Sequence, residues 1–191
     1  MFRFMRNVHL ALGVGFFFVA LLFAFSSIVL IYRPWFPSSS ERTRATAQLE
    51  RGLDARAAAL ALMRSRMAEG ELRNIREGEG KLRFIIWRPG TEVDTVYAPE
   101  TGEATLDTRR YNFYETLVQL HVNHGFFHDF MPANLWALLS LGVSVGLLLL
   151  GASGIYLWYR HPKERRIGTA LIALGFAVPA VALFATRLSG G

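Results

Sequence analysis

The longest uncharged segment of the chain limits its fold more than any other feature. From Phe130 to Tyr159 no residue carries a charge. An α-helix rises about 1.5 Å per residue, so about 20 apolar residues cross a hydrocarbon core of about 30 Å. Aromatic residues suited to the headgroup levels lie near both ends of the segment: Trp136, Tyr156, Trp158 and Tyr159. The sequence therefore predicts a membrane-spanning helix here.

Two further uncharged runs, Val8–Tyr32 and Ile167–Thr186, are also long enough to span a bilayer. An alternative for the first run is a secretory signal peptide cleaved near Ala24-Phe25-Ser26. The apolar core of such a peptide is only about 7–15 residues long, and this run is longer. We therefore expect an uncleaved anchor and three membrane-spanning helices.

The formal net charge of +6 is concentrated beside the apolar runs. Residues 33–134 contain 14 basic and 14 acidic side chains, whereas the rest of the chain contains seven basic residues and one acidic residue. Six of these seven flank apolar runs: Arg3, Arg6, Arg160, Lys163, Arg165 and Arg166. This bias marks the cytoplasmic side of an inner-membrane protein and argues against nucleic-acid binding. We expect the N-terminus in the bacterial cytoplasm, and the soluble domain and C-terminus in the periplasm.

The middle of the chain predicts a small soluble domain. Ser38 and Glu41 have the spacing of a capping box, which begins a helix. Apolar residues at helical spacing then predict an amphipathic helix that ends near Gly70: Leu49, Leu53, Leu60, Met63 and Met67. Strand-like runs separated by turn residues follow: Leu72–Arg76, Lys81–Arg88, Thr91–Tyr97 and Glu103–Thr108. A helix packed on an antiparallel sheet buries both apolar faces, so we expect an α+β domain.

A further helix over Tyr111–Phe127 is expected to approach the membrane again. The predicted fold is thus a helical membrane protein with a small α+β domain inserted between its first and second membrane helices. Its parts are residues 1–33 (cytoplasmic N-terminus and first membrane helix), 34–110 (periplasmic domain), 111–134 (interfacial helix with a histidine cluster), 135–159 (second membrane helix), 160–166 (cytoplasmic loop) and 167–191 (third membrane helix and periplasmic C-terminus).

Several kinds of chemistry are excluded by composition. The chain contains no cysteine, so it has no disulfide, thiolate catalysis, iron–sulfur ligation or covalent c-type haem attachment. A metal or haem would need His, Met or carboxylate ligands. The sequence shows no Gly-rich phosphate loop, Ser/His/Asp order or pair of intramembrane carboxylates, so we expect neither an independent hydrolase nor a pump.

Histidines supply the candidate cofactor ligands. If one helix continues through Gly125, then His121, His124 and His128 share one face within two turns. Imidazole is a good ligand for haem iron, Zn or Cu, and residues four apart on a helix can reach one ion. The face is therefore a candidate site for b-type haem or another metal. The alternative is that these are interfacial or packing residues that bind nothing.

His9 lies at the other end of the first membrane helix, about 30 Å from the level of the other three histidines. It cannot share one haem iron with them. Its possible roles are a separate cytoplasmic-side site, with His161 or with another subunit, or a simple position at the interface.

Small residues form a stripe along the second membrane helix, including Gly142, Gly146 and Gly154. Such residues let helices approach closely in lipid. The stripe indicates helix packing, either against a partner complex or against the chain's own first and third membrane helices.

Several short motifs, in order along the chain, resemble the PepSY-associated transmembrane protein family. They are Leu10-Ala11-Leu12-Gly13 after His9, the turn Thr101-Gly102-Glu103, Leu120-His121-Val122-Asn123-His124-Gly125, and Gly151-Ala152-Ser153-Gly154. Ser26-Ser27 stands where the family's first anchor often carries Thr-Gly. The resemblance implies a PepSY-like domain in the periplasm, and larger relatives include haem-bearing reductases of siderophore-bound iron.

These observations favour a non-catalytic accessory subunit of the inner membrane that docks on a larger membrane complex, including a redox or electron-transfer complex. The partners would then be lipid and other integral membrane subunits. The alternative is a haem-b electron-transfer protein related to the siderophore-iron reductases. A further alternative is a periplasmic binding or inhibitory module for a protease.

Overall fold

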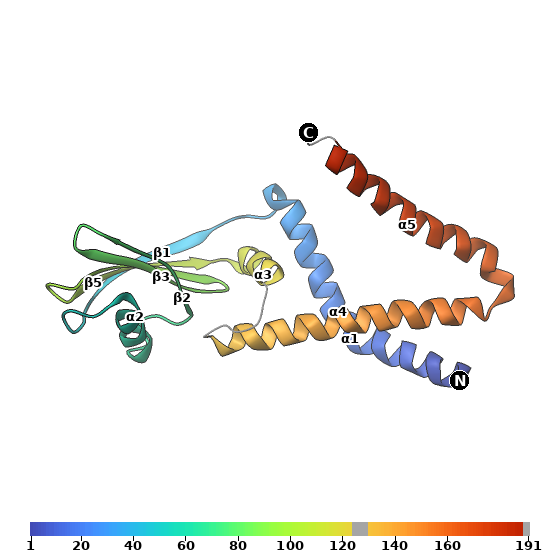
Figure 1. Cartoon of the computed structure of the whole chain (residues 1–191), viewed down its shortest axis with the longest axis horizontal. Coiled ribbons are helices and arrows are strands. Elements are labelled where there is room, and N and C mark those ends of the chain that lie inside the picture. The colour runs from blue at the N-terminus through green and yellow to red at the C-terminus, as the bar shows by residue number, and fades with distance from the viewer. Residues whose placement is uncertain (124–129, 189–191) are drawn as a thin grey trace. The chain divides into compact units, whose positions relative to one another are not determined.

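The computed structural model describes residues 1–123 and 130–188. Within them, three helices are long and apolar enough to cross a membrane: α1 (Phe2–Ile31), α4 (Met131–Tyr159) and α5 (Arg165–Leu188) (Figure 1). Their bounds enclose, to within one residue, the three uncharged runs seen in the sequence. The prediction of a helical membrane protein that contacts the lipid bilayer is confirmed.

The chain divides into two compact units. One unit is residues 19–142, and the other combines residues 1–18 with residues 143–191. The first contains a five-stranded antiparallel sheet in the order β1-β5-β4-β3-β2. Its strands are β1 (Ser40–Gln48), β2 (Glu71–Gly78), β3 (Lys81–Arg88), β4 (Thr91–Ala98) and β5 (Glu103–Tyr111). The last four confirm the predicted strands, and the sheet with its helix confirms the small α+β domain.

Helix α2 (Ala55–Arg64) packs on one face of this sheet, and the hydrophobic core of the domain lies between the helix and the sheet. Small side chains on α2 let the helix approach the sheet closely, because Ala58 and Ala59 are almost completely buried there. The sheet supplies the large core residues: Phe84, Ile86, Val93, Tyr97 and Leu106. The Tyr97 hydroxyl donates to the Glu50 carbonyl (2.5 Å) and accepts from the Leu53 amide (3.2 Å), so this buried polar group is satisfied.

The predicted helix from Ser38 to about Gly70 is wrong over its first half. Residues Ser40–Gln48 form the edge strand β1, which pairs with β5 along nine residues. This pairing gives hydrogen-bond partners to the backbone groups on the outer side of β5. These bonds favour a strand more than the local capping signature favours a helix. The helix begins only after Asp54, whose side chain accepts from the Ala57 amide at 2.7 Å.

Helix α3 (Phe113–Val122) follows β5 directly and is shorter than the predicted Tyr111–Phe127. Asn112 caps its start, and its end is marked by Asn123, whose backbone is extended (φ −70°, ψ 123°). The continuous helix that would place His121, His124 and His128 on one face is therefore not present at Asn123. His124 and His128 lie outside the described residues.

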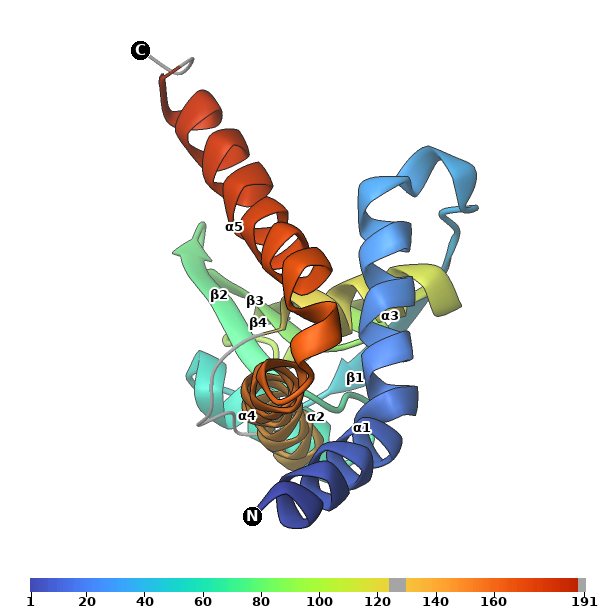
Figure 2. The same ribbon diagram turned by 90° about the vertical axis from the view of Figure 1, so that its right-hand side faces the viewer.

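The second unit contains the first half of α1, most of α4, and α5 (Figure 2). A short 3₁₀ turn, η2 (Pro162–Glu164), connects α4 to α5. None of the residues of α5 is buried. Pro179 lies inside α5, where it removes one backbone hydrogen bond.

Candidate functional site

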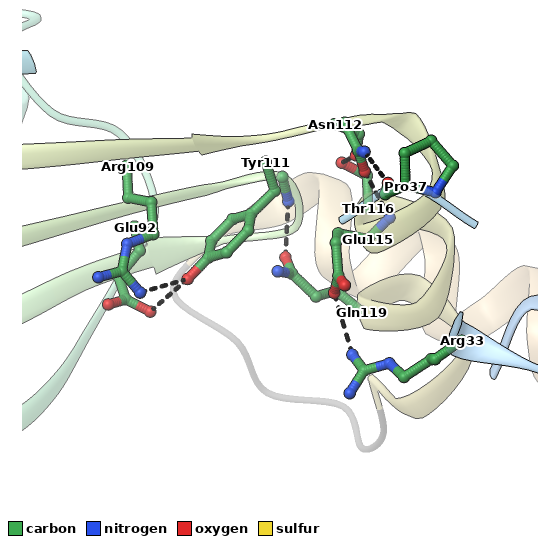
Figure 3. Close-up of polar contacts among 10 residues, drawn as sticks. Arg33, Pro37, Glu92, Arg109, Tyr111, Asn112, Glu115, Thr116 and Gln119 are labelled. Atoms are coloured by element: carbon green, nitrogen blue, oxygen red, sulfur yellow. Dashed lines mark hydrogen bonds and ion pairs between the residues drawn. The ribbon is translucent and has the colours of Figure 1, made fainter. Parts of the chain in front are cut away.

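A polar network joins the sheet to the segment that leaves the first membrane helix (Figure 3). Asn112 is at its centre. Its Oδ1 accepts from the Glu115 amide at 3.0 Å, and its Nδ2 donates to the Pro37 carbonyl and to Ser39 Oγ (3.3 Å). Its own amide donates to the Ser39 carbonyl at 3.1 Å. One side chain thus caps α3 and holds the segment that leaves α1.

An ion pair extends this joint back to the membrane helix. Arg33 follows α1 immediately and pairs with Glu115 in the first turn of α3 at 3.0 Å. The rings of Tyr32 and Trp35 stack 4.5 Å apart beside it, as expected of aromatic residues at a headgroup level. The other end of α3 also contacts the sheet, because Gln119 accepts from the Gly90 amide at 2.8 Å. The sheet is therefore fixed to the exit of α1 at several points.

Two arginines on the open face of the sheet form polar contacts of their own. Arg109 donates to the Tyr111 hydroxyl at 3.5 Å, and this bond raises the pKa of Arg109 above its ordinary value (Figure 3). The hydrogen-bonded ion pair with Asp94 likewise raises the pKa of Arg83. Both guanidinium groups stay charged: Arg83 is paired with a carboxylate, and Arg109 is hydrogen-bonded to a neutral phenol.

His121, on α3, is held by a buried serine of α1. Its Nδ1 lies 2.8 Å from Ser26 Oγ, and Ser26 is 4% exposed. The Ser26 hydroxyl has one hydrogen, which it donates to the Phe23 carbonyl at 2.8 Å. Ser26 Oγ therefore orients the imidazole through Nδ1, and Nε2 lies outside this contact. Phe23 lies beside the imidazole, with ring centroids 5.7 Å apart, and stacks on Trp136 at 5.6 Å.

His9, on α1, has the same kind of support from α4. Its Nδ1 lies 3.0 Å from Ser153 Oγ and 3.2 Å from the Leu150 carbonyl. Two polar groups of α4 therefore hold Nδ1, and Nε2 lies outside these contacts. Ser153 is 1% exposed and itself donates to Leu150 at 3.0 Å. Histidines that ligate metals are oriented in this way, by a hydrogen bond from the second ring nitrogen.

The remaining histidine, His161, ends α4. Its Nδ1 donates to the Leu157 carbonyl at 2.9 Å, and the Phe2 ring lies 6.0 Å away between centroids. No hydrogen bond joins it to His9 among the described residues. Within those residues there is also no group of three or more His, Asp or Glu side chains arranged to hold a metal ion.

The predicted packing glycines are used in different ways. Gly146 faces α1, where an added Cβ would overlap the Phe16 ring. Gly154 also faces α1, and an added Cβ would lie 3.2 Å from His9 Cε1. By contrast, an added Cβ at Gly142 or Gly151 would meet no described atom within 4 Å beyond its chain neighbours and the backbone of its own helix turn. The stripe therefore serves packing within the chain on one side and is open on another.

Sequence reasoning finds His9 and His121 but misses their serine partners. Ser26 enters it only in the alternative cleavage site and where the family pattern has Thr-Gly, and Ser153 only within the Gly151–Gly154 motif. Asn112 and Glu115 were missed as well, although an Asn three residues before a Glu is a recognisable helix start. No protein-family model, curated protein or solved structure matches the chain. The resemblance to PepSY-associated proteins stays a prediction.

Proposed function

We propose that this chain is a non-catalytic accessory subunit of the bacterial inner membrane, which carries a PepSY-like periplasmic domain and docks on a larger membrane complex. The observation that supports it most is α5. This apolar helix is 24 residues long and buries none of its residues against the rest of the described chain. A surface of that length is available to other membrane chains.

Helix association in lipid depends on close packing, because lipid tails are as apolar as the side chains themselves. Glycines without neighbours are therefore the positions where a partner helix can come closest. At Gly151 on α4 and Gly175 on α5, an added Cβ would meet no described atom within 4 Å beyond its chain neighbours and the backbone of its own helix turn. We assign partner contact to these two faces, while Gly146 and Gly154 serve packing on α1.

The joint around Asn112 supports the same proposal. Asn112 and the Arg33–Glu115 ion pair attach the domain to the segment that leaves α1. This attachment restricts the orientation of the domain relative to that helix. The domain can then present the same face to every neighbouring complex. A domain that searched for a distant soluble substrate would gain nothing from this attachment.

The test uses the full chain expressed in its native membrane and extracted in mild detergent. Gly151→Leu and Gly175→Leu should each shift the chain from a larger complex to smaller species in native electrophoresis. Gly146→Leu is the matched control, since it adds the same side chain to α4 but on the face occupied by Phe16. It should disturb folding, seen as lower yield, before it releases a partner. A wild-type chain that migrates only as a monomer, under conditions that preserve other complexes, would contradict the proposal.

A second candidate function, haem-b electron transfer, is favoured by the orientation of His121. Its Nδ1 lies 2.8 Å from Ser26 Oγ, so His121 would hold a haem through its other ring nitrogen. When bound, a haem would supply one-electron redox chemistry. The chain's own part is to hold the orientation of the imidazole and to place Phe23 beside it, with Trp136 stacked on Phe23.

The optical spectrum of the protein purified from haem-replete cells tests this second function. His121→Ala should remove the Soret band, and Ser26→Ala should shift or weaken it, because the imidazole loses its orienting partner. His9→Ala should leave this site unchanged. A protein without any Soret absorbance would reject haem binding and leave the accessory role unaffected.

A further inference from the structure

An arginine-lined cavity lies at the end of the sheet where β1 begins and β5 ends. It has a volume of about 170 Å³. Its charged and hydroxyl lining consists of Arg66, Glu69, Arg88, Thr91, Thr108 and Arg110. Because three guanidinium groups face one carboxylate, the lining carries a formal excess of positive charge.

The strand register explains how these groups meet. Thr91 of β4 lies opposite Arg88 of β3 on one side and opposite Arg110 of β5 on the other. Neighbouring strands are about 4.8 Å apart, so the two arginines flank the Thr91 hydroxyl on the same face of the sheet. Arg66 comes from the turn after α2, in the left-handed backbone conformation (φ 58°). Three separate segments therefore bring a guanidinium to one place.

Most of this positive charge has no partner within the described chain. Arg88 pairs with Glu69 at 2.9 Å. Arg66 and Arg110 form no ion pair with any described residue within 4.0 Å. Glu41 lies opposite Arg110 on β1, but it does not line the cavity. Guanidinium forks bind phosphate oxygens in pairs, and a threonine hydroxyl adds a further donor.

The cavity lies at the end of the domain that is attached to the membrane helix. Arg110 is two residues before Asn112, which binds Pro37 and Ser39 of the segment leaving α1. Tyr32 and Trp35 stack at the start of that segment, and such aromatic residues favour the headgroup level of a membrane. A basic pocket beside a membrane surface is well placed to bind an anionic lipid headgroup.

We propose that this cavity binds a phosphate group, carried by the headgroup of an anionic phospholipid, between Arg66, Arg110 and the Thr91 hydroxyl. The cavity volume of about 170 Å³ is several times the volume of about 30 Å³ that one water molecule takes up in the liquid. The cavity therefore has room for a phosphate. The site is independent of the proposed partner docking, since it needs only this chain and lipid. Failure of one proposal would leave the other standing.

The test is lipid titration of the full chain in detergent, followed by native mass spectrometry. Phosphatidylglycerol should bind more tightly than phosphatidylcholine. The double variant Arg66→Gln/Arg110→Gln should lose at least about tenfold in affinity for phosphatidylglycerol, because each charge-assisted contact contributes about that factor. The matched control is Arg51→Gln/Arg76→Gln, which removes the same charge from exposed arginines that form no ion pair with a described residue and do not line the cavity. It should bind like the wild type.

Two results would overturn the inference. Equal losses in the cavity variant and the control would show that net charge, and not this cavity, attracts the lipid. Binding of inorganic phosphate as tightly as phosphatidylglycerol, with the same dependence on Arg66 and Arg110, would assign the site to a free anion. Far-ultraviolet circular dichroism of both variants confirms that neither loss comes from unfolding.

Discussion

The joint centred on Asn112 allows a prediction that separates its two roles. Asn112→Asp keeps the side-chain oxygen that caps α3 but removes the two Nδ2–H donations to Pro37 and Ser39. Asn112→Ala removes the cap as well. A net hydrogen bond contributes about 0.5–1.5 kcal/mol, and these two are exposed to water, so we expect Asn112→Asp to cost about 1–2 kcal/mol. The loss of the cap should add about 1 kcal/mol in Asn112→Ala.

Hydrogen–deuterium exchange of the full chain in nanodiscs measures these costs locally. A change of 1–2 kcal/mol in the free energy of opening corresponds to about five- to thirtyfold faster exchange. The amides to follow lie in α3, including that of Thr116, which donates to the Asn112 carbonyl at 3.0 Å. Asn112→Asp should raise their exchange within this range, and Asn112→Ala should raise it about fivefold further.

Asp54→Ala is the matched control, because Asp54 caps α2 in the same way but makes no contact at the joint. It should speed exchange in α2 by about fivefold and leave α3 unchanged. If Asn112→Asp exchanged like the wild type in α3, the contacts with Pro37 and Ser39 would contribute nothing. The inference that the domain is fixed to α1 would then lose its main support.

The membrane helices and four strands were predictable because their signals are local. Uncharged runs set the spans, and alternating residues such as Phe84 and Ile86 set the strands between Gly- and Pro-containing turns. The strand bounds observed agree with those expected to within three residues. Hydropathy alone cannot give the orientation of the chain in the membrane, which stays a prediction from the charge bias.

Strand β1 was not predictable in the same way. Eight of its nine residues are exposed, so it has no alternation of apolar and polar side chains to reveal it. It is a strand because β5 offers a free edge some 60 residues later in the chain, and no local propensity reports such a partner. The capping signature at Ser38 and Glu41 was a false signal, while Asp54 and Asn112 are the caps that form.

For the histidines, too, local features could be predicted from the sequence and contacts with distant residues could not. Their residue type and position near membrane ends were visible in the sequence. Their orientation depends on serines 95 residues away for His121 and 144 residues away for His9. Only the packing of the helices reveals that both rings are held through Nδ1.

Two further predictions concern topology and the core. Since the chain has no cysteine, single cysteines at Glu79 and Lys163 can be probed cleanly, and an impermeant reagent should label position 79 from the periplasm but not position 163; the reverse pattern would invert the proposed orientation. Thr95 is fully buried, and its hydroxyl has no hydrogen-bond partner among the described residues. Thr95→Val keeps the shape and removes the cost of burying that hydroxyl, about 1–2 kcal/mol, so amide exchange in β4 and β5 should slow by about five- to thirtyfold. Thr105→Val, half-buried on the opposite face, should change these rates less, and faster exchange in Thr95→Val would show that the hydroxyl stabilises the core.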